Sequence, residues 1–72
     1  MPGMPVATGN ETVRALERAG WLAVYQKGSH VKLVRGGGVV IVPRHRKPLR
    51  PGTLRAIIRQ AGLTPEQFTA LL

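Results

Sequence analysis

The stretch WLAVYQKGSHVKLVRGGGVVIVP, residues 21–43, decides the fold of this chain. Two turns that contain glycine, at 27–29 and 35–38, divide it into three short segments. All three segments are rich in β-branched or aromatic side chains, which favour strands, and Pro43 ends the last one. We therefore predict an antiparallel three-stranded meander, with strands at residues 21–26, 30–34 and 39–42.

The second strand shows the alternation that is typical of a strand with one buried face. Successive strand side chains point to opposite faces, so Val31 and Leu33 are expected to face the core. His30, Lys32 and Val34 are then expected on the opposite face.

The face on which two aromatic residues of the first strand lie depends on whether this strand is regular. Trp21 and Tyr25 would share the face of His30 only if this strand carried no bulge. In that position Tyr25 would either stack on a nucleic-acid base or pack as a partly buried side chain.

Helical patterns flank the meander on both sides. Asn10 is predicted to cap a helix over residues 11–19, with Gly20 as its stop. A second helix is predicted over 53–61, where apolar residues recur at helical spacing. Thr64 begins a capping-box pattern that predicts a short third helix.

These elements predict one small α+β domain. Residues 1–9 contain two prolines and two glycines without a period, and we expect them to form a flexible leader to a single domain over 10–72. The order is α-β-β-β-α with a short C-terminal helix. Both main helices should cover one face of the sheet and leave the other face open.

The composition favours a polyanionic partner. The 72 residues carry a formal net charge of +8 and have a pI near 11.8, which makes nucleic acid the first candidate. No apolar run is long enough to span a bilayer, and no cysteine or apolar export segment is present. We therefore expect a cytoplasmic protein without a membrane partner.

The few acidic residues restrict the possible chemistry. The chain has three glutamates, no aspartate, no cysteine and two histidines, a set that disfavours metal sites, carboxylate pairs and serine triads. We expect no metal and no cofactor. Acid–base chemistry by histidine remains possible, and RNA cleavage fits it because the substrate supplies the 2′-hydroxyl as nucleophile.

The topology of the meander predicts where this chemistry would occur. The first turn and the end of the third strand meet at one edge of the sheet, close to the start of the second long helix. His30 is the candidate acid or base at this edge. The candidate RNA-binding residues are Lys27, Gly28, Ser29, Lys32, Arg44, His45, Arg46, Lys47, Arg50 and Arg55.

Several motifs in this order resemble those of the HicA family of toxins. The resemblance covers roughly residues 10–70 and rests on Gly20-Trp21, on Gln26 to His30, on Val42 to His45, on Leu49 to Arg55 and on Gln60 to Thr64. It implies a fold like that of double-stranded-RNA-binding domains, cleavage of mRNA, and a cognate HicB-like antitoxin that masks the site.

The resemblance also implies a role for one residue. The catalytic histidine of the family's Gly-Ser-His motif corresponds to His30. Many family members carry a second histidine directly after it, where this chain has Val31. Because Val31 is expected to face the core, we do not expect this difference to abolish catalysis.

The leading hypothesis is a metal-independent endoribonuclease toxin that uses His30 as general acid or base. One alternative is an RNA-binding module of the same fold in which His30 has no catalytic role. Another is a basic adaptor for protein interactions, which would show no salt-dependent affinity for RNA.

Overall fold

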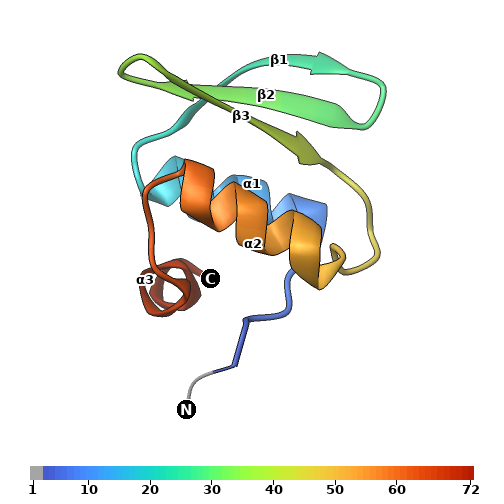
Figure 1. The fold of residues 1–72 in the computed structure, drawn as a ribbon. Coiled ribbons are helices and arrows are strands. Elements are labelled where there is room, and N and C mark those ends of the chain that lie inside the picture. Colours follow the sequence, from blue (N-terminus) through green and yellow to red (C-terminus); the bar gives the residue numbers. More distant parts are fainter. Residues whose placement is uncertain (1–2) are drawn as a thin grey trace.

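The computed structural model describes residues 3–72, and its three antiparallel strands form one sheet in the order β1-β2-β3 (Figure 1). The strands are β1 (Leu22–Lys27), β2 (His30–Arg35) and β3 (Gly38–Pro43). This confirms the predicted meander. All three strands end one residue later than predicted, because Lys27 and Pro43 both pair with His30, and Arg35 pairs with Gly38.

The turn between β1 and β2 requires a glycine. Gly28, its first central residue, has φ of 57°, in the left-handed region that side chains with a Cβ rarely adopt. Two-residue turns with a glycine at this position match the right-handed twist of paired strands. The turn thereby fixes the register that places Lys27 opposite His30.

Three helices complete the order α-β-β-β-α-α and confirm the predicted α+β class. They are α1 (Gly9–Arg18), α2 (Pro51–Gln60) and α3 (Pro65–Leu71). Figure 1 shows α1 and α2 beneath one face of the sheet, with α1 behind α2 in this view and α3 beyond them. Within residues 3–72, no helix has the length and apolar character needed to cross a membrane.

Helix α1 begins earlier than predicted. Its cap is Thr8, not Asn10: the Thr8 hydroxyl accepts from the Glu11 N–H at 3.1 Å, and the Glu11 carboxylate accepts from the Thr8 N–H at 2.9 Å. This capping box satisfies two donors at once, which a single asparagine cap does not.

Helix α2 also begins earlier than predicted, at Pro51 instead of Thr53. Proline suits the first helical position because its fixed φ is helical and its missing N–H would have no partner there. The predicted capping box of α3 is confirmed, with Thr64 and Gln67 exchanging two hydrogen bonds of 3.1 and 2.9 Å.

Residues directly before α1 are packed against the rest of the chain. Ala7 is buried with 1% of its surface exposed, and its carbonyl accepts from the Leu49 N–H at 2.9 Å. Gly9 already belongs to α1. Part of the predicted leader is therefore held in place in the structure, and residues 1–2 of it lie outside the described part. The division into a leader and a domain stays a prediction.

The core lies between the inner face of the sheet and the helices. Val31 and Leu33 of β2 are buried, as the alternation predicts. The apolar stripe of α2 is buried as well, and Phe68 brings α3 into the same core. The α2 stripe consists of Leu54, Ile57 and Ile58, and the remaining core side chains are Ala7, Val13, Ala15, Leu16, Trp21, Val40, Val42, Leu49 and Ala61.

A bulge in β1 separates the two aromatic residues. The register shifts between Ala23 and Tyr25, so Val24 is the extra residue. Tyr25 remains opposite Lys32 on the outer face and is 60% exposed, whereas Trp21 turns inward and is 6% exposed. The bulge therefore places only one of the two aromatic side chains on the face of His30.

Candidate functional site

A pocket lies where β2, the end of β3 and the start of α2 meet. Its volume is about 690 Å³, and it is open to solvent on one side. His30 reaches it from the sheet and Thr53 from the first turn of α2. Its lining residues are His30, Pro43, His45, Arg46, Lys47, Pro48, Leu49, Arg50 and Thr53.

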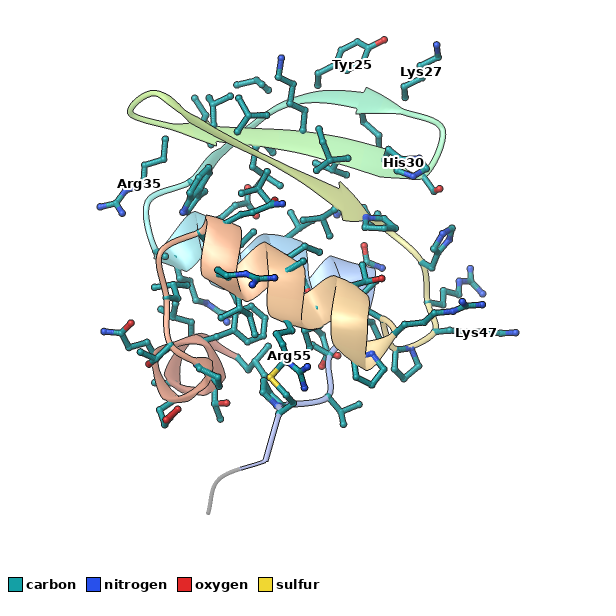
Figure 2. All side chains as sticks on the ribbon, viewed as in Figure 1. Tyr25, Lys27, His30, Arg35, Lys47 and Arg55 are labelled. Atoms are coloured by element: carbon teal, nitrogen blue, oxygen red, sulfur yellow. The ribbon has the colours of Figure 1, made fainter. Side chains whose placement is uncertain are left out.

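His30 stands at the first position of β2, on the face of the sheet that the helices leave open. Its exposed side chain lies in register between Lys27 on β1 and Pro43 on β3. Directly opposed strand residues have Cβ atoms roughly 5 Å apart, so the Lys27 stem and the imidazole are neighbours. Figure 2 shows Tyr25 and Lys27 extending from this open face and His30 near its end.

The loop between β3 and α2 forms the opposite wall of the pocket, and the residues before and in α1 hold it in place. The Gly9 N–H donates to the His45 carbonyl at 3.2 Å, and the Leu49 N–H donates to Ala7. These two hydrogen bonds fasten both ends of the basic segment 45–49. Its position therefore does not depend on its own exposed side chains.

Gly9 allows this attachment by having no side chain. An added Cβ would lie 2.6 Å from the Arg44 Cα and 2.7 Å from the His45 nitrogen. Both atoms belong to the backbone and cannot turn away. The approach of α1 to the loop therefore requires glycine at this position.

Arg44 connects three parts of the chain instead of lining the pocket. Its backbone N–H donates to the Ser29 carbonyl in the β1–β2 turn, and its Nε donates to the Asn10 side-chain oxygen in α1. The residue thereby joins the turn beside His30 to the N-terminal end of α1. We assign it a structural role at the edge of the site.

The structure brings four of the ten predicted RNA-binding residues together with the predicted catalytic residue. His30, His45, Arg46, Lys47 and Arg50 all line the pocket.

The other predicted residues lie outside the pocket. Lys27 and Lys32 project from the outer face of the sheet, and Gly28 and Ser29 form the turn beside His30. Figure 2 shows Arg55 on the side of α2 that faces away from the sheet, which is the solvent-exposed side expected from the helical spacing, and its contact with RNA stays a prediction.

The prediction missed Thr53 as a lining residue because it started α2 too late. With Pro51 at the first helical position, Gly52 and Thr53 lie in the first turn, where backbone N–H groups have no partner within the helix. The Arg-Pro-Gly sequence at 50–52 carried the signal, since proline is favoured at the start of a helix.

The pocket is cationic and has no acidic lining residue among those described. Glu11 and Glu17 lie on α1, and Glu66 lies on α3. Across residues 3–72, no group of three or more histidine or acidic side chains is arranged to hold a metal ion. The arrangement suits an anionic ligand that is held by Arg46, Lys47 and Arg50 next to an imidazole.

The family comparison agrees with this geometry. A family model described as "HicA toxin of bacterial toxin-antitoxin" matches residues 9–63, from the start of α1 through α2. No protein of curated function matches the chain significantly. The match covers most of the 72 residues. The chain therefore belongs to the HicA family, the toxins of bacterial toxin-antitoxin pairs.

Proposed function

We propose that this protein is a metal-independent endoribonuclease that cleaves mRNA, with His30 as its general acid or base. The observation that carries the proposal is the pocket that is lined by His30 together with Arg46, Lys47 and Arg50 and by no acidic residue. Membership in a family of toxins supports a harmful activity of this kind.

The proposed reaction uses the RNA's own nucleophile. The 2′-hydroxyl loses its proton and attacks the adjacent phosphorus, and the 5′-oxygen of the next nucleotide leaves with a proton. The protein therefore has two tasks, which are to transfer protons and to stabilise the charge on the phosphorane. His30 is proposed for the first task, and Arg46, Lys47 and Arg50 for the second.

Cleavage needs a second proton-transfer group if His30 only accepts a proton from the 2′-hydroxyl or only donates one to the leaving 5′-oxygen. His45 is the other imidazole that lines the pocket. It is held through its backbone, since its carbonyl accepts from Gly9 and its N–H donates to the Pro43 carbonyl at 3.1 Å. We therefore propose His45 as the candidate partner of His30, acting directly or through a substrate group.

Product analysis tests the reaction. The purified protein is expected to cut single-stranded RNA in the presence of EDTA and to leave 2′,3′-cyclic phosphate and 5′-hydroxyl ends. Mass spectrometry of the fragments identifies both ends. Products with a 5′-phosphate would contradict the proposed attack by the 2′-hydroxyl.

The alternative is an RNA-binding module of the same fold without catalysis. It is favoured by the basic residues outside the pocket, because Lys27 and Lys32 form a cationic surface that could follow an RNA backbone without reaction. Under this alternative, RNA would bind and remain intact.

Salt dependence tests whether Lys47 contacts phosphate. For single-stranded nucleic acid, each neutralised phosphate contributes about 0.7 to the slope of log affinity against log salt concentration. Lys47→Gln is therefore expected to reduce this slope by about 0.7 and to weaken binding similarly for different RNA sequences. Binding titrations by fluorescence anisotropy at several salt concentrations measure it.

Arg14→Gln is the matched control. It removes one positive charge from the exposed side of α1, where Arg14 lines a separate small pocket with Glu11 and Arg18. The slope is expected to remain that of the unmodified protein. Equal reductions for both variants would mean that net charge, and not contact at Lys47, determines the affinity.

A further inference from the structure

The open face of the sheet carries more exposed apolar surface than the proposed reaction uses. Three cross-strand rows can be read from the pairing of the strands. The row at the pocket is Lys27, His30 and Pro43, the middle row is Tyr25, Lys32 and Ile41, and the far row is Leu22, Val34 and Val39. The face therefore changes from cationic at the pocket to aliphatic at its other end.

The aliphatic side chains of this face are substantially exposed. The exposed fractions are 63% for Leu22, 50% for Val39 and 45% for Ile41, and Val24 at the bulge is 49% exposed. The helices cover only the inner face (Figure 1), so no described part of the chain protects these residues. A contiguous exposed apolar patch on a small protein marks an interaction surface.

Nucleic acid does not suit the far row. Leucine and valine side chains neither bind phosphate nor offer an aromatic face on which a base can stack. Burial against apolar protein surface is the interaction that removes them from water favourably. The occupant of this end is therefore a protein.

The charge of the face selects among proteins. The strand residues on this face include Lys27 and Lys32 and no acidic residue. Two copies packed sheet to sheet would bring these cations together, and each chain has a formal net charge of +8. A second copy is thus disfavoured, whereas an acidic partner would gain both apolar burial and charge complementarity.

We propose that the outer face of the sheet is the docking surface for an acidic protein partner, the antitoxin of this toxin-antitoxin pair. The aliphatic far row anchors the partner. Tyr25 and Lys32 of the middle row lie between this anchor and the row that contains His30. A stable interface needs about 800 Å² per partner, roughly a sixth of this molecule's 4750 Å² of accessible surface. A partner that covers the face therefore also covers His30.

Docking then regulates the site by exclusion. RNA and the partner compete for the end of the sheet at His30, although the anchor lies at the other end. That docking silences RNA cleavage rests on the proposed function, whereas the location of the docking surface does not. Substitutions in the far row should consequently weaken binding of the partner and leave the RNA cleavage rate of the toxin unchanged.

The test uses Leu22→Thr/Val39→Thr, which removes apolar surface from the far row and keeps residues that favour strands. The probe is the purified cognate antitoxin, and its affinity is measured by isothermal titration calorimetry. We expect the affinity to fall about tenfold or more, since two aliphatic side chains of the anchor lose their apolar burial against the partner. Circular dichroism and thermal unfolding verify that the variant is folded.

The matched control is Val6→Thr/Leu72→Thr, which changes two side chains that are also exposed, at 76% and 44%, but lie outside the sheet. It should bind the antitoxin like the unmodified protein. Equal antitoxin affinity of the far-row variant and the control would overturn the proposal. It would also be overturned if the far-row variant changed only the self-association of the protein or only its affinity for RNA.

RNA cleavage without antitoxin is measured on the same variants. The far-row variant should cut RNA at the rate of the unmodified protein and should remain active at antitoxin concentrations that silence the control. If the unmodified protein does not cut RNA, the proposed function fails, and the calorimetric comparison still decides the location of the docking surface.

Discussion

His30→Ala is expected to lower the rate constant of RNA cleavage by about 10²- to 10⁴-fold, the usual contribution of a positioned acid or base. The affinity for RNA should change little, because the basic side chains that line the pocket remain. His30 is exposed at the start of β2 and contributes nothing to the core, so the fold should be unchanged. Single-turnover cleavage and equilibrium binding to a non-cleavable RNA separate the two effects.

Lys27→Ala is the matched control for this prediction. It truncates the side chain directly opposite His30 in the same row of the sheet. It should weaken RNA binding and leave most of the single-turnover rate at saturating protein. Cleavage by His30→Ala at the rate of the unmodified protein would contradict the assigned role, as would a loss of cleavage explained entirely by lost binding.

Gly9→Ala is expected to destabilise the fold by about 3 kcal/mol or more, since the new methyl group would overlap backbone atoms of Arg44 and His45. The N-terminal end of α1 would have to separate from the loop that lines the pocket. For a domain of this size, this loss corresponds to a melting temperature lower by roughly 12 °C or more. Thermal unfolding can be followed by circular dichroism or by the fluorescence of the single tryptophan, Trp21, which is buried.

Gly52→Ala is the control for the glycine prediction. Gly52 also lies in the first turn of a helix, but it is exposed and an added Cβ would meet nothing within 4 Å. This variant should be as stable as the unmodified protein or slightly more stable, because alanine restricts the unfolded chain. Equal stability of the two variants would show that close packing at Gly9 does not hold α1 to the loop.

Local patterns in the sequence were sufficient for most of the fold. The alternation in β2 predicted which side chains are buried, and it correctly placed His30 and Lys32 on the open face. The capping box at Thr64 predicted α3 because both of its hydrogen bonds join residues three apart in the chain. Such features depend on neighbours in sequence, and a single sequence displays them directly.

Features set by contacts across the fold were not predictable in this way. The segment before α1 has the composition of a loop, but Ala7 and Gly9 are held by Leu49 and His45, which are distant in the sequence. The bulge at Val24 likewise leaves no recognisable pattern. Whether Trp21 and Tyr25 share the face of His30 depends on this bulge, and only the pairing of the strands shows that it is present.

The candidate site likewise combines features that the sequence predicts with features that depend on contacts across the fold. The meander correctly predicted that His30 and the basic loop lie at one edge of the sheet. The direction of each side chain was not predictable, because it depends on how α2 is rotated and on partners such as Asn10, which engages Arg44. The catalytic role of His30 and the phosphate contacts of the basic residues stay predictions.

The most direct test of the proposed reaction uses a strand in which one ribonucleotide is placed among 2′-O-methyl nucleotides. The purified protein, in EDTA, should cut such a strand only on the 3′ side of the ribonucleotide, at a position that it cuts in unmodified RNA. A strand that is 2′-O-methylated throughout should be bound and remain intact. Cleavage of the fully methylated strand, or binding of unmodified RNA without any cleavage, would contradict the proposal that the pocket at His30 activates the 2′-hydroxyl of its substrate.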